Sequence, residues 1–162
     1  MNRSEQIVMK FCSKTFFSLW SYSQPQGKNK STELCDILVI CEPDVITISV
    51  KEVELKDSGN YDVDVERWHR EAIEKSCKQI YGAERRIKQT SHVIMKNRET
   101  GLPFPEASDM RVHRIAVALG GKDKVPIYFG DFGKGFIHIF DEQSLFILIS
   151  ELNTIEDFVN YR

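Results

Sequence analysis

The stretch Thr32–Leu55, TELCDILVICEPDVITISVKEVEL, constrains the fold of this chain more than any other part of its sequence. Two segments rich in β-branched and other apolar residues, Leu34–Cys41 and Val45–Lys51, flank the break Glu42-Pro43-Asp44. β-Branched residues favour strands, and a proline followed by an acidic residue favours a turn between them. We therefore predict a β-hairpin that closes on this break.

The predicted hairpin brings a carboxylate and a lysine together within apolar strands. Antiparallel strands mirror about their turn, which places Asp36 opposite Ser49 to Lys51. Side chains alternate between the two faces of a strand, so Thr47, Ser49 and Lys51 form a polar stripe on one face. This arrangement suits a catalytic site. The structural alternative is a half-buried ion pair between Asp36 and Lys51, which is costly to bury.

An aspartate on one strand and (D/E)-x-K on the next resembles the signature of the PD-(D/E)XK nuclease superfamily, which includes restriction-endonuclease-like enzymes. Asp36 matches the aspartate and Lys51 the lysine, whereas Ser49 stands where the signature has an acidic residue. The stretches GKNKSTELCDILVICEPDVITISVK and RWHREAIEKSCKQIYGAERRI are similar to a family of uncharacterised bacterial nuclease-like proteins within this superfamily. The resemblance brings no established substrate with it.

The resemblance implies hydrolysis of DNA phosphodiester bonds with Mg²⁺ or Mn²⁺, cations that take acidic oxygen ligands and keep several waters. Asp36 would be a metal ligand, and Lys51 would orient the attacking water or stabilise charge on the phosphate. Ser49 offers only a neutral hydroxyl to the cation. A second carboxylate is therefore expected from Glu33 or Glu5, and without one the site would be a catalytically degenerate module that binds nucleic acid or a protein.

Apolar residues at helical spacing predict a helix over Ser4–Leu19, with Ser4 as its N-cap. Glu5 lies in the first turn, where a carboxylate also suits the helix dipole. In the resembled superfamily an N-terminal helix often brings a glutamate to the metal site, which makes Glu5 a candidate ligand. Both interpretations of Glu5 stay open at this point.

A second, longer helix is predicted over Val65–Gln89, with Asp62 or Asp64 as its cap. In many folds of the resembled superfamily this helix lends a polar residue to the active site, and Gln79 matches that role. Gly82 lies in the middle of the helix, where glycine costs about 1 kcal/mol relative to alanine. We expect close packing of the helix on the sheet to be the reason for it.

The remaining segments complete an α/β chain. Ser21–Ser31 is predicted to be a loop, and its Lys28 and Lys30 either contact phosphates or are simply solvated. Lys96–Ser108 is also predicted to be a loop, and GDFGKG a hairpin turn rather than a phosphate-binding loop. Further strands are expected at Thr90–Met95, Val112–Leu119, Pro126–Phe129 and Phe136–Phe140, and a helix capped by Asp141 at Glu142–Leu152.

This order of elements predicts one α/β domain, residues 1–162, with a central mixed sheet flanked by helices. The resemblance implies a restriction-endonuclease-like αβββαβ core. The alternative interpretation of residues 1–162 is that they are the N-terminal domain of a longer protein. The chain has 162 residues and a net charge of −2, so a nucleic-acid partner, DNA before RNA, would need a local basic patch.

We expect a cytoplasmic protein with reduced thiols, because no apolar stretch approaches a membrane span and the four cysteines lack regular disulfide spacing. Many enzymes of the resembled superfamily cut duplexes as dimers, so the resemblance admits a homodimer. No zinc motif or hydrolase elbow is present in the sequence.

Overall fold

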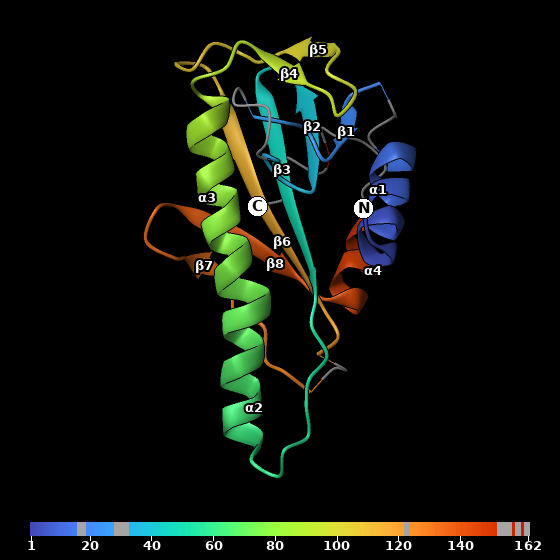
Figure 1. Cartoon of the computed structure of the whole chain (residues 1–162), viewed down its shortest axis with the longest axis vertical. Coiled ribbons are helices and arrows are strands. Elements are labelled where there is room, and N and C mark those ends of the chain that lie inside the picture. Colours follow the sequence, from blue (N-terminus) through green and yellow to red (C-terminus); the bar gives the residue numbers. More distant parts are fainter. Residues whose placement is uncertain (16–18, 28–32, 122–123, 152–156, 158–159, 161–162) are drawn as a thin grey trace.

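The computed structural model describes residues 1–15, 19–27, 33–121, 124–151, 157 and 160. It is an α/β fold with a six-stranded mixed sheet, in the order β1-β2-β3-β6-β8-β7, and a small β4-β5 sheet (Figure 1). The predicted fold class, a mixed sheet flanked by helices, is thereby confirmed. The strands are β1 (Ser21–Ser23), β2 (Ile37–Cys41), β3 (Asp44–Glu52), β4 (His92–Ile94), β5 (Thr100–Pro103), β6 (Arg111–Leu119), β7 (Gly130–Asp131) and β8 (Phe136–Phe140).

The predicted hairpin forms the centre of the large sheet. Strands β2 and β3 are antiparallel, and their register pairs Ile37 with Ile48 and Cys41 with Asp44. Asp36, which immediately precedes β2, therefore lies opposite Ser49, as the mirror symmetry of the hairpin predicts.

A long helix connects β3 to its parallel partner β6. Strands β3 and β6 run in parallel over their whole lengths, and β6 is also parallel to β8. Parallel neighbours need a crossover connection, which is supplied here by α2 (Tyr61–Trp68), the π-helical segment η1 (His69–Glu74) and α3 (Lys75–Ile87). Figure 1 shows this helix on one face of the sheet, with α1 (Arg3–Thr15) and α4 (Glu142–Glu151) on the other.

Alternation along β3 divides the core between the two faces of the sheet. Ile46, Ile48 and Val50 pack with Val8 and Cys12 of α1. On the opposite face Val45 packs against residues of α3, while the polar Thr47 and Ser49 belong to the same face by alternation. Full burial of an aliphatic side chain contributes about 1.5–3 kcal/mol, so these contacts fix which side of β3 faces α3.

Three predicted helix details were wrong. The long helix begins at Tyr61, because Asn60 rather than Asp62 or Asp64 accepts the backbone N–H of Val63. Asp64 instead accepts hydrogen bonds from the backbone and hydroxyl of Ser58. Gly82 does not pack on the sheet, since a Cβ added there would meet no atom within 4 Å. The helix α1 begins at Arg3, and its N-cap is Asn2 instead of the predicted Ser4.

Ser21–Ser31 was predicted to be a loop, but Ser21–Ser23 form β1, which pairs with β2. The C-terminal half differs from prediction in two further segments. Lys96–Ser108 contains β5, which pairs with β4 in a hairpin, so it is not entirely loop. Residues 126–129 form no strand, and the edge strand β7 begins at Gly130. Asp141 caps α4 as predicted, by accepting the backbone N–H of Ser144 at 2.8 Å. No helix in the described parts of the chain is long and apolar enough to cross a membrane.

Candidate active site around Asp36

Asp36 is the centre of a buried polar cluster at the open end of the β2–β3 hairpin. Its Oδ2 accepts hydrogen bonds from the backbone N–H of Val50 at 2.6 Å and from Ser49 Oγ at 3.2 Å. Its Oδ1 accepts from Gln79 Nε2 of α3 at 3.3 Å, and Lys51 Nζ lies 4.0 Å from Oδ2. The four residues predicted to be catalytic, Asp36, Ser49, Lys51 and Gln79, are therefore in one place.

Ser49 connects this cluster to α3. Its Oγ lies 3.1 Å from Gln79 Oε1 and 3.3 Å from Ser76 Oγ, and the Ser76 hydroxyl donates to the carbonyl of Ala72 at 2.7 Å. A serine hydroxyl has one proton to donate, so the ionised Asp36 and the amide of Gln79 compete for that of Ser49. Ser49 is fully buried and acts as a hydrogen-bonding bridge rather than as an acid.

Lys51 forms the solvent-facing side of the cluster. Its side chain is 33% exposed, whereas that of Asp36 is 5% exposed. An ion pair with one partner so open to water contributes little to folding stability, about 0–1 kcal/mol. The ammonium group is thus positioned where a group entering from solvent would meet it beside the carboxylate.

Glu33 supplies a second carboxylate close to Asp36. The pKa of Glu33 is raised from 4.5 to about 7, first by burial and then by the charge of Asp36 and a hydrogen bond with it. The charge of Glu5 raises this pKa further, while Lys51 lowers it. Glu33 lies before β2 begins, in a bridge with Gln26, so strand alternation does not turn it away from Asp36.

Glu5 borders the site, but its carboxylate is used to cap α1. Its oxygens accept hydrogen bonds from the backbone N–H of Asn2 at 3.0 Å and from Asn2 Nδ2 at 2.8 Å. The backbone N–H of Glu5 donates in return to Asn2 Oδ1 at 2.8 Å, which completes a capping box. Gln24 Nε2 also donates to Glu5, at 3.3 Å. Helix capping, one of the two interpretations of Glu5, accounts for these contacts.

Asp36 and Glu33 are the acidic pair that best fits a hard divalent cation. Mg²⁺ usually takes only one or two carboxylates and completes its shell with waters and substrate oxygens. Burial is the largest cause of the raised pKa of Glu33, and the charge of Asp36 adds to it; a bound cation would relieve that repulsion. Across the described ranges, no group of three or more His, Cys, Asp or Glu side chains is arranged to hold a metal ion.

Two contacts of the site were not predicted from the sequence. Gln24 links Glu5 to Lys96, whose Nζ donates to Gln24 Oε1 at 3.2 Å. No periodic pattern in the sequence indicates this contact. The backbone N–H of Val50 holds Asp36, which only the hairpin register could indicate. Lys28 and Lys30, the predicted nucleic-acid-binding residues, lie outside the described residues.

Comparison of this chain with protein-family models, with curated proteins and with solved structures gave no match.

Proposed function

We propose that the chain is a metal-dependent nuclease domain of the PD-(D/E)XK type, which hydrolyses DNA phosphodiester bonds with Mg²⁺ or Mn²⁺. The observation that carries the proposal is the meeting of Asp36, Glu33 and Lys51 at one end of the hairpin, beside Gln79 of the following helix. Two acids next to a partly exposed lysine provide for a cation, a water and a phosphate at the same place.

The order of the elements supports the same proposal. Along the chain, α1 is followed by β1–β3, the long helix α2–α3, the small β4–β5 hairpin and then β6. Apart from the inserted β4–β5 hairpin, this order agrees with the αβββαβ core that the resemblance implies, and the antiparallel hairpin lies inside a mixed sheet. Fold order alone does not specify an activity, so the proposal depends on the site residues.

Asp36 and Glu33 would hold the cation, and the other residues have separate roles. A bound divalent cation supplies positive charge at the phosphate and makes a coordinated water more acidic. Lys51 would orient the attacking water and stabilise the charge that develops on the phosphate oxygens. Gln79 and the backbone N–H of Val50 hold the Asp36 carboxylate in place from two sides.

One observation favours a second function, that of a nuclease-like module without catalysis. Ser49 occupies the position where the superfamily signature has an acid, and its hydroxyl is already directed at protein acceptors. The acidic set is thereby reduced to Asp36 and Glu33, with Glu5 engaged in capping. A module of this kind would bind nucleic acid or a protein partner without cutting.

A cleavage assay tests the proposal and separates the two functions. Supercoiled plasmid, linear duplex, single-stranded DNA and RNA are each incubated with Mn²⁺, Mg²⁺ or EDTA. The variants are Asp36→Asn, Lys51→Ala and, as a matched control, Lys56→Ala at an exposed lysine outside the cluster. Asparagine keeps an acceptor for the N–H of Val50, so Asp36→Asn removes the charge while retaining the fold.

The proposed nuclease predicts metal-dependent cutting that Asp36→Asn and Lys51→Ala each reduce at least about 100-fold, with Lys56→Ala unchanged. Cutting that survives in EDTA, or that both site variants share with the wild type, would refute it. Nucleic-acid binding without any cutting would favour the non-catalytic module.

A further inference from the structure

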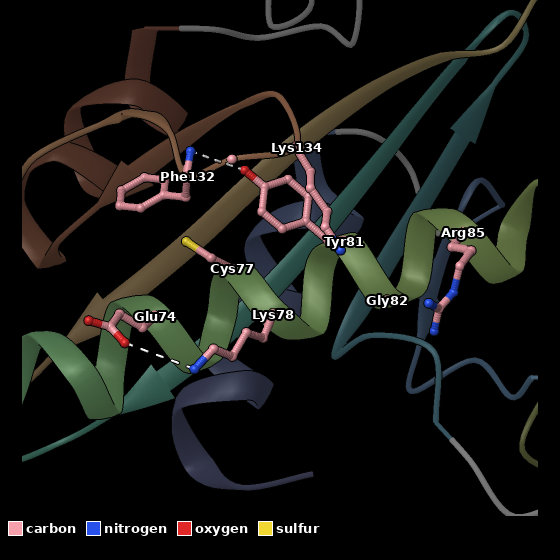
Figure 2. Close-up of a pocket in the computed structure, with 9 residues that line it drawn as sticks. Glu74, Cys77, Lys78, Tyr81, Gly82, Arg85, Phe132 and Lys134 are labelled. Carbon is pink, nitrogen blue, oxygen red and sulfur yellow. Dashed lines mark hydrogen bonds and ion pairs between the residues drawn. The ribbon is translucent and has the colours of Figure 1, made fainter.

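A cavity of about 620 Å³ lies between α3 and the turn that joins β7 to β8. Figure 2 shows that α3 provides one wall and the turn provides the other, with Phe132 and Lys134 reaching from the turn. It faces a different flank of α3 from Gln79, which points to Asp36. The residues that matter here are Lys78, Tyr81, Gly82, Arg85, Phe132 and Lys134.

The turn that forms the outer wall is held in place by specific hydrogen bonds. Tyr81 Oη accepts the backbone N–H of Phe132 at 3.2 Å (Figure 2). It also donates to the carbonyl of Gly135 at 2.5 Å. Within the turn, Asp131 Oδ1 accepts the backbone N–H groups of Gly133 and Gly135 at 2.7 and 2.9 Å. The cavity is therefore built before any ligand arrives, which lowers the entropic cost of binding.

The charge of this cavity is opposite to that of the whole chain. The chain has a net charge of −2, whereas the cavity is lined by three basic residues and one acidic residue, Glu74. Glu74 pairs with Lys78, at 4.0 Å. Arg85 and Lys134 have no acidic partner among the residues that the structure describes. The unpaired cations favour an anionic ligand.

Exposed aromatic rings lie beside these cations. Phe132 is 40% exposed, and Phe129 and Phe136 are exposed as well, with their ring centroids 6.2 Å apart. Large apolar side chains grouped at a surface usually mark a binding site. Rings beside unpaired cations are the combination that proteins use to stack unpaired bases and hold the phosphates between them.

Gly82 connects this cavity to the Asp36 site. A glycine inside a helix destabilises it relative to alanine, yet a Cβ at Gly82 would meet nothing within 4 Å. Packing within the described chain therefore does not require the glycine, whereas a closely approaching ligand would. Gln79, which contacts Asp36, lies one turn earlier on the helix. Gly82 has no side chain, so no side chain at this position separates the cavity from Gln79.

We propose that this cavity binds an unpaired nucleotide of a single-stranded nucleic acid. A base lies against Phe132, the phosphates lie near Arg85 and Lys134, and the strand crosses α3 at Gly82 toward Asp36. The inference rests on the proposed function for its choice of nucleic acid and adds the strandedness of the substrate. A paired base in a duplex cannot lie against Phe132 in this cavity without leaving its stack.

Binding is tested on the whole chain in EDTA, where no cutting interferes. The probe is a fluorescein-labelled oligothymidylate about 16 nucleotides long, and binding is followed by its fluorescence anisotropy. This length matches the largest site size of a single-strand-binding fold. We expect Phe132→Ala to weaken binding about 5- to 150-fold, which corresponds to the loss of one stacked base. Phe146→Ala, which changes an exposed phenylalanine on α4, is the matched control and should bind as the wild type does.

Salt dependence measures the phosphate contacts separately. Each phosphate contact to a single strand contributes about 0.7 to the slope of log K against log salt concentration. The double variant Arg85→Ala/Lys134→Ala should therefore reduce the slope by about 1.4. Lys10→Ala, at an exposed lysine of α1, should leave the slope unchanged.

Gly82→Ala distinguishes a ligand site from a purely structural feature. The substitution should raise the melting temperature by about 2–4 °C, because alanine is the better helix former, while it weakens oligothymidylate binding several-fold. A stabilised variant that binds as well as the wild type would contradict a strand crossing at this position. Since the variant is expected to be more stable, loss of folding cannot account for weaker binding.

Three further results would overturn the inference. They are tighter binding of a hairpin duplex than of oligothymidylate, full competition by thymidine monophosphate at equal concentration, and unchanged affinity in Phe132→Ala. Its failure is distinct from that of the proposed function. Duplex cutting without single-strand binding would refute the cavity assignment alone, whereas single-strand binding without cutting would refute only the nuclease.

Discussion

Replacing Glu33 by glutamine should change how the stability of this protein depends on pH. The pKa of Glu33 is raised from 4.5 to about 7, so between these values the folded chain binds more protons than the unfolded chain. The free energy of unfolding therefore falls as the pH rises through this window, and the full penalty is present above pH 7. Glu33→Gln removes the carboxylate and with it the penalty.

The size of the effect follows from the pKa. At 1.36 kcal/mol per pKa unit, the rise from 4.5 to about 7 corresponds to about 3 kcal/mol. Glu33 is only half-buried, and screening by water reduces this value to about 1–2 kcal/mol. Most of the difference between wild type and Glu33→Gln should develop between about pH 5 and pH 8.

Urea denaturation of both proteins at about pH 5 and pH 8 measures this difference. Subtracting the two curves removes every pH-dependent contribution that the two proteins share, because they differ only at residue 33. Glu66→Gln, at an exposed carboxylate of α2, is the control and should show no such change. A wild-type stability that rises relative to Glu33→Gln between the two pH values would refute the proximity of Glu33 to Asp36.

Three other substitutions test separate parts of the structure. Ser49→Asp adds a buried charge beside the Asp36 carboxylate, so the free energy of unfolding at about pH 8 should fall by about 3 kcal/mol. Mn²⁺ should restore part of this loss, and an equal loss with and without Mn²⁺ would contradict the cation site. Gly120→Ala should cost at least about 2 kcal/mol in urea denaturation, because φ is +87° and the added Cβ would lie 2.4 Å from the carbonyl oxygen of Val53. Asn2→Ala should cost about 1 kcal/mol by losing the N-cap that Glu5 completes, with a matching loss of helical circular dichroism.

The hairpin and the position of Asp36 could be predicted from sequence because both depend on local rules. Strand alternation and a proline turn fix which residues of β3 share a face, and the mirror relation fixes what lies opposite Asp36. The role of Gln79 was predicted instead from the family resemblance. Helical spacing agrees with that prediction, since Ser76 and Gln79 lie one turn apart and both contact Ser49.

The remaining features depend on contacts between distant segments. Glu33 faces Asp36 because the chain pairs with Gln26 before β2 begins, and no period in the sequence indicates that bridge. Helix starts were misplaced for a related reason, since asparagine, aspartate and serine are near-equivalent as N-caps and only the folded backbone selects Asn2 and Asn60. Gly82 was misinterpreted because sequence cannot distinguish a glycine that packs from one that leaves open space.

The central claim, that Asp36 and Glu33 form a cation site, is tested most directly by Mn²⁺ binding followed by electron paramagnetic resonance. The free Mn²⁺ signal is titrated with wild type, Asp36→Asn and the control Glu66→Gln at about pH 8, where Glu33 is ionised. We expect one strong site in the wild type and the control, and an affinity at least about 10-fold lower in Asp36→Asn. Equal Mn²⁺ binding by all three proteins, or no binding by the wild type, would contradict the claim.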